Sequence, residues 1–409
     1  MKKPNKRKII NDPVFGFINI PNDLIYDIIQ HPYFQRLGRI KQLGLTSTVY
    51  PGAQHTRFQH SLGAMHLMGE AIAQLRQVGQ EITPAEAEAV RACILLHDIG
   101  HGPFSHALEH TLVKGVRHEE LSLLMMKQIS SELNGKLDMA ISIFTNSYSK
   151  KFLHQLVSSQ LDMDRLDYLS RDSFYSGVSE GVIGAARIIK MLNVHDDHLV
   201  VEAKGIYSIE KFLVARRLMY WQVYLHKTSV AAEKMLINIL HRAKVLASDG
   251  QELFCSPSLH YFMYNDIDKS RFEQDPLALT NFASLDDSDI IAALKVWASS
   301  SDIVLSTLCY AFINRKLFKA QIRTASLPSS ETNELLAKYM AHFSIPESEA
   351  TYFFAQQTVS TDTYSPKDDR INILYKDGTV KDIADASDML NIAVLTKKVE
   401  KHYLFYYKT

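Results

Sequence analysis

A long apolar helix that ends in two polar residues is the feature that most constrains the fold of this chain. The run AEAVRACILLHDIG follows a helix-start signature, in which Thr83 is the N-cap, Pro84 takes the first helical position and Glu86 completes a capping box. His97 and Asp98 therefore lie at the buried C-terminal end of this helix. Burying an imidazole and a carboxylate costs several kcal/mol unless they are paired or bound to a metal. The sequence thus predicts a helical core organised around a polar site.

Apolar residues at three- and four-residue spacings predict helices over most of the 409 residues. We expect a short hairpin at 9–20, a helix from His60 to about Val78, and one long, central, buried helix over 208–248. After about residue 325 the pattern changes: RINILYKDGTVKDI alternates around an Asp-Gly turn, which predicts a hairpin, and HYLFYYKT is strand-like. Further predicted elements are helices in LIYDIIQ, FQRLGRIKQLG and DDSDIIAALKVW and a hairpin at 193–207.

The predicted fold is mostly α, with a short N-terminal hairpin and a small α+β C-terminal appendage. We divide the chain into an N-terminal hairpin and helix segment (1–50), a metal-binding helical core (51–180), a helical continuation that completes the site (181–325) and the α+β region (326–409).

Composition excludes several classes of protein. The 45 basic and 45 acidic residues give zero formal charge, so no overall field draws the chain to nucleic acid or to a membrane. Cys93, Cys255 and Cys309 are widely separated, which fits a reducing compartment and argues against a disulfide scaffold or a cysteine-bound zinc. Because we find no signal peptide and no apolar run of bilayer length, we expect a cytoplasmic protein.

Four residues form a candidate metal site: His60, His97, Asp98 and Asp164. Two glycines and a proline follow the His-Asp pair, which allows close approach of backbone and metal. This mixed nitrogen and oxygen set suits Mn, Fe, Ni, Zn or Mg rather than a thiolate-binding metal. The alternative is a hydrogen-bonded polar cluster in the core. A metal held this way, with histidines and arginines around it, indicates phosphate-ester hydrolysis.

Further residues divide into two candidate groups. His101, His106, Glu109 and His118 form a set in which at least one transfers a proton, although each alone fits a structural role equally well. The candidate phosphate and sugar contacts are Arg57, Arg165, Tyr168, Asp172, Arg216 and Tyr224. Arg216 also fits a solvated helix face. We interpret His55, His66 and His110 as surface or packing histidines.

The motifs INDPVFG, HPYFQRLGRIKQLG, VYPGAQHTRFQHSLG, LLHDIGHGPFSH and DMDRLDYLSRD resemble those of the HD-domain deoxynucleoside triphosphate triphosphohydrolases, across about residues 8–320. The resemblance implies a helical HD-domain core that releases a deoxynucleoside and intact triphosphate, using one divalent ion and additional Mg with the nucleotide. It also implies a homo-oligomer, as a dimer or tetramer. The implied metal ligands are His60, His97, Asp98 and Asp164, and the implied catalytic pair is His106 and Glu109.

The same resemblance implies roles for the remaining candidates. His101 and His118 lie beside the phosphates, while Arg57, Arg165, Tyr168 and Arg216 hold them. Tyr168 and Asp172 contact the sugar 3′-hydroxyl, and Tyr224 crowds a ribose 2′-hydroxyl.

The sequence departs from the family where guanine effectors bind. Gln30 and Gly38 stand where the family has an acid and an arginine, although Lys8 and Gln35 match and Arg39 is a neighbouring substitute. Activation by dGTP or GTP is therefore in doubt. Two other functions stay open: an HD phosphohydrolase of another nucleotide (a monophosphate, cyclic nucleotide or alarmone), or a non-catalytic regulator that binds nucleotide or nucleic acid.

Overall fold

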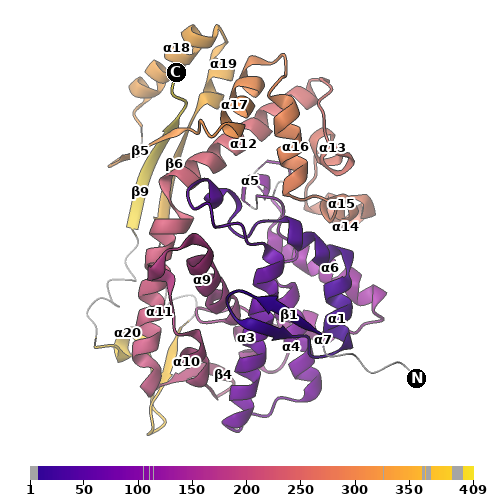
Figure 1. Cartoon of the computed structure of the whole chain (residues 1–409), viewed down its shortest axis with the longest axis vertical. Helices are drawn as coiled ribbons and strands as arrows, with labels where there is room; N and C mark the ends of the chain where they lie inside the picture. The colour runs from indigo at the N-terminus through magenta and orange to yellow at the C-terminus, as the bar shows by residue number, and fades with distance from the viewer. Residues whose placement is uncertain are drawn as a thin grey trace.

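The structure, a computed structural model, is an elongated and mostly helical molecule (Figure 1), which confirms the predicted fold class. It describes residues 8–104, 106–109, 111–113, 115–325, 327–361, 364, 370–388 and 399–409, with His106, Glu109 and Thr361 described by their backbone only.

The N-terminal hairpin is present as predicted. Strands β1 (Ile9–Asp12) and β2 (Gly16–Asn19) pair antiparallel, and the side chain of Asp12 accepts hydrogen bonds from the backbone of the turn. Ile18 is fully buried and anchors the hairpin to the helical body.

The next segment is less regular than predicted. Helices α1 (Asp23–Gln30) and α2 (Pro32–Gln35) are followed by the 3₁₀ turns η1 (Arg36–Arg39) and η2 (Gly44–Thr48), so the helix expected over FQRLGRIKQLG is wrong. The fully buried Arg36 donates to the carbonyls of Ile99, His101 and Leu285. Three long-range bonds from one guanidinium override local helical preference, and they brace the backbone beside His97 and Asp98.

Three helices form the centre of the lower part of Figure 1. Helix α3 (Arg57–Gln77) packs against both α4 (Pro84–Leu96) and α9 (Met163–Ser176). The predicted capping box of Thr83 and Glu86 opens α4. Gly100 permits the next close contact, because a Cβ there would lie 2.2 Å from the carbonyl oxygen of His118. These contacts bring the ends of α3, α4 and α9 together.

Further helices, turns and a hairpin accompany these three helices. The hairpin of β3 (Leu192–His195) and β4 (His198–Glu202) confirms that prediction. The others are α5 (His106–Glu109), α6 (His118–Glu132), α7 (Asp138–Phe144), α8 (Lys151–Gln155), η3 (Ser179–Gly181), α10 (Ala185–Lys190) and η4 (Ala203–Gly205).

The single helix predicted over 208–248 is wrong. The structure has α11 (Ile206–Met219), a π-helical turn η5 (Tyr220–Tyr224) and α12 (Lys227–Ser248), whose N-cap is His226. Apolar residues continue through the break, so periodicity alone does not reveal it. π-turns inside helices are frequent at functional sites, because they redirect side chains.

Helices around α12 build the upper part of the molecule (Figure 1). The predicted start of α16 is confirmed, since Asp286 caps it and Asp289 completes a capping box. These helices are α13 (Pro257–Tyr264), α14 (Lys269–Gln274), α15 (Pro276–Phe282), α16 (Asp287–Trp297) and α17 (Ile303–Ile313).

The C-terminal region contains two sheets. In the first, β9 (Val399–Tyr406) lies between β5 (Lys319–Arg323) and β6 (Phe354–Thr361), antiparallel to both. In the second, β7 (Asn372–Leu374) and β8 (Val380–Asp382) form the predicted Asp-Gly hairpin, and β7 also pairs parallel with β4. The C-terminal hairpin thus extends the sheet of residues 192–202. The helical elements here are α18 (Ser329–Phe343), α19 (Glu347–Ala350), η6 (Thr351–Phe353) and α20 (Ile383–Ala386).

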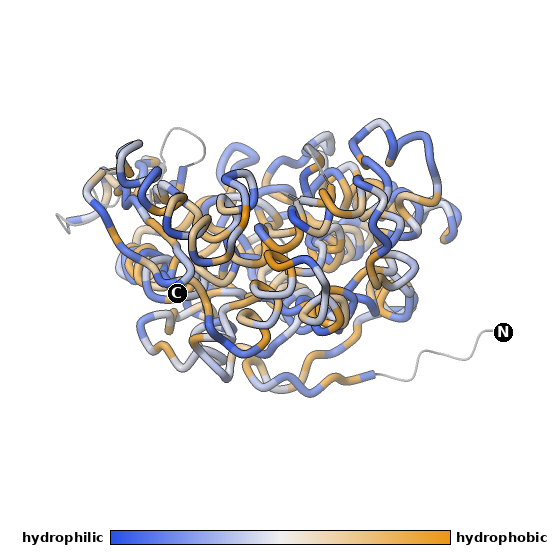
Figure 2. Tube along the Cα trace, turned by 90° about the horizontal axis from the view of Figure 1, so that it is seen from above, coloured by the Kyte–Doolittle hydropathy of each residue, from blue (hydrophilic) through white to orange (hydrophobic). Residues whose placement is uncertain are grey.

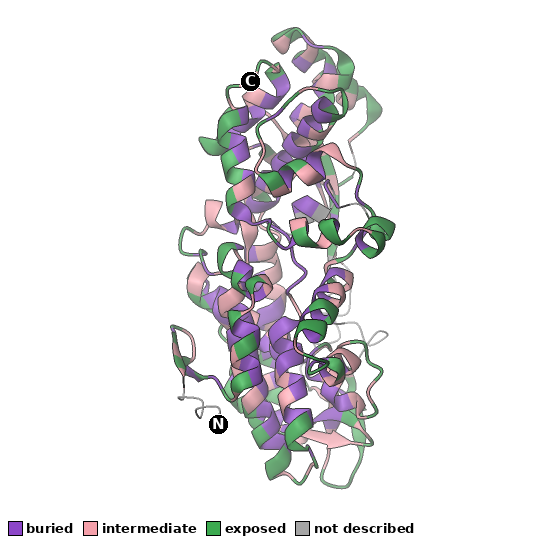
Figure 3. Ribbon diagram, turned by 90° about the vertical axis from the view of Figure 1, so that its right-hand side faces the viewer, coloured by how far each residue is buried: buried purple, intermediate pink, exposed green. Residues whose placement is uncertain are grey.

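A continuous apolar core runs through the described residues. Hydrophobic segments gather inside the helical body, and hydrophilic ones lie at its edge (Figure 2). The inner faces of the helices are buried and their outer faces exposed (Figure 3). No helix within the described ranges has both the length and the apolar character that crossing a bilayer requires.

Candidate metal centre

The four predicted ligands come together where three helices meet. His60 lies in the first turns of α3, His97 and Asp98 directly follow α4, and Asp164 lies in the first turn of α9. His60 Nε2 is 3.1 Å from Asp164 Oδ1 and 3.7 Å from Asp98 Oδ2. His97 Nε2 is 3.4 Å from both Asp98 Oδ1 and Asp164 Oδ1. His60, His97 and Asp164 therefore offer ligand atoms around one point, and Asp98 lies beside them while also forming a group with His101 and His118.

Both imidazoles are oriented for ligation. His60 Nδ1 lies 2.7 Å from Asp167 Oδ2, and His97 Nδ1 lies 2.6 Å from the carbonyl oxygen of Ile94. Each bond leaves Nε2 pointing into the cluster, where neither Nε2 atom has a hydrogen-bond partner of good geometry among the described residues. Buried polar atoms without partners are rare and call for an explanation. A cation at the common point would satisfy both.

The electrostatics of the cluster also favour a cation. Burial by itself lowers the pKa of His60, but Asp164 and Asp167 outweigh it and raise that pKa to about 10. Burial raises the pKa of Asp98, yet His97, His101 and Arg57 hold it well below its usual range. The carboxylates are thus ionised, and their charge must be balanced by protons on the imidazoles or by a metal. The residues present fit a divalent metal ion.

Access to the centre comes from the side of Asp164. The side chain of His60 is fully buried, whereas that of Asp98 is 13% exposed and that of Asp164 is 28% exposed. A ligand of the metal would therefore approach over the first turn of α9.

A second group lies against the first. Asp98 Oδ1 is 3.3 Å from His101 Nε2, and the rings of His101 and His118 stack with centroids 3.9 Å apart. Burial, followed by the charge of Arg57, lowers the pKa of His101 to about 3, which leaves this imidazole neutral. Arg57 itself donates to Asp98 Oδ2 at 2.5 Å. The predicted residues His101, His118 and Arg57 are therefore all beside the candidate ligands.

Two other predicted residues can be placed only by backbone. His106 and Glu109 form the short helix α5, which follows the turn after Asp98, and their side chains lie outside the described residues. His110 also lies outside them.

The two remaining predicted arginines are held by one loop. Arg165 Nε donates to the carbonyl oxygen of Ser159 at 2.7 Å, and an Arg216 terminal nitrogen donates to Gln160 Oε1 at 2.8 Å. Arg216 is nearly buried, and its Nε has no hydrogen-bond partner among the described residues. Its guanidinium also lies 5.9 Å from the ring centre of Tyr220 in the π-helical turn. An anionic group could pair with the donors that remain.

The predicted sugar contacts form a hydrogen-bonded group. The hydroxyl of Tyr224 donates to Asp172 Oδ2 at 2.8 Å, and His55 Nε2 lies 2.8 Å from Asp172 Oδ1. Burial, and then the charge of Asp172, raise the pKa of Tyr224, so its hydroxyl stays protonated. The Tyr168 and Tyr224 rings meet edge to face with centroids 6.0 Å apart. Tyr168, Asp172 and Tyr224 are therefore neighbours.

Sequence reasoning missed several residues of this region. His55, interpreted as a surface or packing residue, is buried and stacks on Tyr175, but it also bonds Asp172. Asp167 was not assigned a role, although its position three residues after Asp164 on one helix was a usable signal. Gln160 and Tyr220 carried no signal, because only the fold brings them to Arg216.

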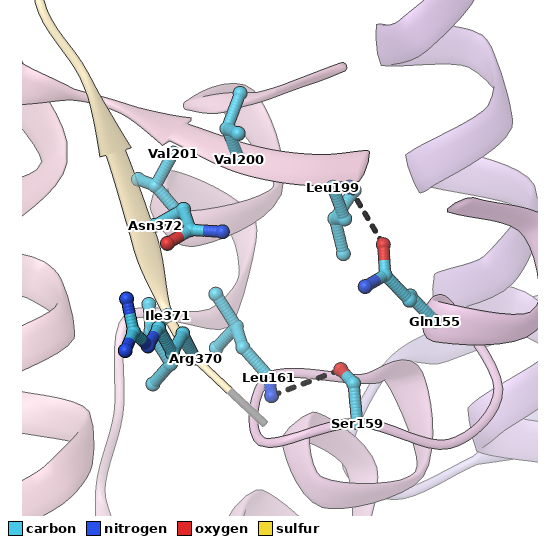
Figure 4. Close-up of a pocket in the computed structure, with 9 residues that line it drawn as sticks. All are labelled: Gln155, Ser159, Leu161, Leu199, Val200, Val201, Arg370, Ile371 and Asn372. Atoms are coloured by element: carbon cyan, nitrogen blue, oxygen red, sulfur yellow. Dashed lines mark hydrogen bonds between the residues drawn. The ribbon is translucent and has the colours of Figure 1, made fainter. Parts of the chain in front are cut away.

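A small pocket lies behind the loop that holds the arginines (Figure 4). The loop at Ser159 and Leu161 forms one wall, and the paired strands β4 and β7 form another. Gln155 accepts a hydrogen bond from the backbone of Leu199 at 2.7 Å, and Ser159 accepts one from Leu161 at 3.1 Å. Arg370, Ile371 and Asn372 at the start of the C-terminal hairpin line the same pocket as the loop that bonds Arg165 and Arg216.

The predicted effector residues are engaged within the chain. Gln35 donates to the carbonyl oxygen of Ile29, and the ammonium of Lys8 lies 3.2 Å from the ring centre of Tyr26. Arg39, the suggested substitute, pairs with Asp286 at 2.5 Å. An effector base would have to compete with that ion pair.

Two known protein-family regions match the part of the chain that contains most of these residues. An HD domain matches residues 57–172, and an HD associated region matches residues 183–252. The chain is 32% identical to YwfO, an uncharacterised protein of Bacillus subtilis, over 99% of this chain and 93% of that protein.

Two further relatives have more informative names. The chain is 35% identical to the deoxynucleoside triphosphate triphosphohydrolase SAMHD1 homologue of Dictyostelium discoideum, over 58% of this chain and 49% of that protein. It is 62% identical to a phosphohydrolase of Bacteroides thetaiotaomicron, whose crystal structure matches with a TM-score of 0.96 over 98% of this chain and 100% of that one.

Proposed function

Because the chain belongs to the HD-domain phosphohydrolase family, we propose that it is a deoxynucleoside triphosphate triphosphohydrolase, which releases a deoxynucleoside and intact triphosphate. Metal-dependent hydrolysis of phosphate esters is the activity of the family. The choice of substrate and the roles of individual residues are the proposal.

One observation carries the proposal. The orphaned Nε2 atoms of His60 and His97 face the carboxylates of Asp98 and Asp164 within 3.7 Å. These four side chains would hold the divalent ion, which when bound supplies Lewis-acid stabilisation of charge on a phosphoryl oxygen. Mg, Mn, Fe, Ni and Zn all accept such a nitrogen and oxygen set. Additional Mg would accompany the nucleotide.

The arginines bind the triphosphate. Arg57 lies beside Asp98, while Arg165 and Arg216 are held by the loop at 159–160. Guanidinium groups match phosphate oxygens in paired hydrogen bonds. In the proposal these three guanidinium groups hold the triphosphate so that its α-phosphate lies at the metal centre.

The tyrosines and Asp172 select the sugar. Tyr168 and Asp172 contact the 3′-hydroxyl, and Tyr224 occupies the space that a 2′-hydroxyl needs. His55 and Tyr224 hold the Asp172 carboxylate in place by a hydrogen bond to each of its oxygens. A site of this kind favours deoxyribonucleotides.

Proton transfer is assigned to the histidines. Following the family pattern, His106, oriented by Glu109, protonates the leaving 5′-oxygen or assists attack. His101 and His118, whose rings stack on each other, lie beside the phosphates. The active form is a homo-oligomer, a dimer or tetramer.

Product analysis tests the proposal. Purified protein reconstituted with Mn²⁺ or Mg²⁺ is incubated with each dNTP and each NTP, with and without dGTP, and the products are separated by chromatography. Deoxynucleoside with intact triphosphate supports the proposal. Orthophosphate or pyrophosphate as the product, or turnover of monophosphates, cyclic nucleotides or alarmones instead, contradicts it. Binding of nucleotide without turnover by metal-loaded protein indicates a regulator.

A further inference from the structure

A chain of buried charged groups connects the N-terminal hairpin to His60. Arg171 on α9 donates to Asp12 Oδ2 at 2.7 Å, and its other nitrogens donate to the two oxygens of Asp167 at 2.9 and 3.0 Å. Asp167 Oδ2 in turn lies 2.7 Å from His60 Nδ1. Hydrogen bonds therefore link Asp12 in strand β1, through Arg171 and then Asp167, to the candidate metal ligand His60.

The four linked side chains are almost completely shielded from solvent. Arg171, Asp167 and His60 have no exposed surface, and Asp12 is 7% exposed. Buried charges of this kind do not add stability over apolar side chains of the same volume, so their presence calls for another reason. Fixing one geometry of His60 is such a reason, since a carboxylate on Nδ1 holds the ring and keeps the Nε2 lone pair available for a metal.

The backbone makes room for this arrangement at Gly63 on α3. A Cβ at that position would lie 1.9 Å from Asp167 Oδ1 and 2.1 Å from a terminal nitrogen of Arg171. Helix α3 therefore presents a glycine at the point where the Asp167–Arg171 pair passes it. The next glycine of the same helix, Gly69, has no such contact, because its nearest neighbour would be an Arg91 nitrogen at 3.4 Å.

Asp12, which is the first of these linked residues, also holds the turn of the N-terminal hairpin. While Asp12 Oδ2 receives Arg171, Asp12 Oδ1 accepts hydrogen bonds from the backbone of Val14 at 3.0 Å and Phe15 at 2.9 Å. The ring of Phe15 lies 5.6 Å from the Arg171 guanidinium carbon. One carboxylate thus fixes both the shape of the turn and the position of the arginine.

We infer that Asp167, Arg171 and Asp12 are positioning residues for the metal centre, and that docking of the N-terminal hairpin sets how tightly the metal is held. The inference rests on the proposed metal centre and extends it to residues that contact neither metal nor substrate. Asp167 acts on His60 directly, Arg171 fixes Asp167, and Asp12 fixes Arg171. The effect on metal affinity decreases along that order.

The test measures the affinity for Mn²⁺ of wild type and of Asp167→Asn, Arg171→Met and Asp12→Asn, by competition with a chelator. Removing a residue that hydrogen-bonds to a metal ligand typically lowers the metal affinity about 10- to 100-fold. We expect a loss at the upper end of that range for Asp167→Asn and about 10-fold for Asp12→Asn.

Arg242 provides a matched control. Like Arg171, it is a buried arginine between two carboxylates: its guanidinium bonds Asp302 and lies 2.9 Å from Glu349. It belongs to α12 and has no contact with the centre among the interactions described. Arg242→Met should lower the melting temperature as Arg171→Met does, but leave Mn²⁺ affinity at the wild-type value. Should Arg171→Met not fold, Arg171→Lys and Asp12→Asn take its place.

The outcomes separate the inference from the proposed function. Wild type that binds no Mn²⁺ overturns the proposed centre and the inference with it. Wild type that binds Mn²⁺, with folded Asp167→Asn and Asp12→Asn binding it equally well, overturns the inference alone. Weaker binding in these variants together with unchanged binding in Arg242→Met supports it.

Discussion

Two histidine–carboxylate pairs connect the region of α3 to α9, and they differ in what faces the second ring nitrogen. His60 bonds Asp167 at 2.7 Å, and His55 bonds Asp172 at 2.8 Å. The two histidines are five residues apart, with His55 just before the start of α3 and His60 within it, and the two aspartates are five residues apart on α9. Around His60 the second nitrogen faces the carboxylates of Asp164 and Asp98. The ring of His55 instead stacks on Tyr175 with centroids 4.5 Å apart.

The two carboxylates also differ in the group that binds their second oxygen. Asp167 is held by the guanidinium of Arg171, a permanent charge, whereas the second oxygen of Asp172 accepts from the neutral hydroxyl of Tyr224. A buried imidazole–carboxylate pair therefore does not by itself make a metal site. In the proposed function, the carboxylates of Asp98 and Asp164 on the far side of the ring make His60 a metal ligand. Among the described contacts His55 has no carboxylate besides that of Asp172, and the proposal assigns Asp172 to the sugar.

The largest expected effect comes from removing an anionic ligand. We expect Asp164→Ala to lose the metal and to lower turnover by more than about 1000-fold, because even outer partners of ligands cost about 10- to 100-fold. Metal analysis of purified protein and product chromatography measure both. Circular dichroism should show an intact fold, since Asp164 is partly exposed in the first turn of α9. Full metal content in this variant would contradict the ligand assignment.

Asp172→Asn breaks the other pair. It removes a charged acceptor from both His55 and Tyr224, which is worth about 1.5–3 kcal/mol, so we expect kcat/KM for dNTPs to fall on the order of 10- to 100-fold. The metal content should stay at the wild-type value. Steady-state kinetics with parallel metal analysis gives the two readouts. If the metal is lost here too, the two pairs are not functionally distinct.

Gly63→Ala perturbs the first pair through packing. Its Cβ would clash with the Asp167 and Arg171 side chains, and overpacking of this kind costs about 1–3 kcal/mol. We expect a lower free energy of unfolding in urea and weaker metal binding. The matched variant Gly69→Ala should be stabilised by about 0.5–1 kcal/mol, because alanine favours a helix interior more than glycine does. Equal effects of the two substitutions would contradict the close approach at Gly63.

The smallest effect is expected at Tyr224. Tyr224→Phe removes one hydrogen bond to Asp172 but keeps the ring, at a cost of about 1 kcal/mol in stability or substrate binding. Discrimination against ribonucleotides should persist in this variant and weaken in Tyr224→Ala, which opens the space beside the sugar. Competition between dATP and ATP measures the ratio, and equal discrimination by both variants would remove Tyr224 from sugar selection.

Local patterns were sufficient to predict some parts of the molecule and not others. The cap at Thr83, the Asp-Gly turn at 377–378 and the strand-like C-terminus depend on neighbouring residues, so the sequence predicts them. The π-helical turn at Tyr220–Tyr224 interrupts a continuous apolar run, and no local signal distinguishes it from a helix. The parallel pairing of β4 with β7 joins segments about 170 residues apart, which no periodicity shows.

The site follows the same rule. The pair His97-Asp98 stands out because polar residues end an apolar helix. Asp164, Asp167 and Asp172 occupy one polar helix, and only the packing of α3 against α9 shows which of them face His60 and which faces His55. The inferred role of Asp12 is even harder to predict from the sequence, because it depends on where the N-terminal hairpin packs against α9.

An anomalous diffraction map from crystals grown with Mn²⁺ tests the central claim most directly. We predict one strong peak within coordination distance of His60 Nε2, His97 Nε2 and oxygens of Asp98 and Asp164. A fully loaded crystal with no peak there, or with its only peak between Asp98, His101 and His118, would contradict the account.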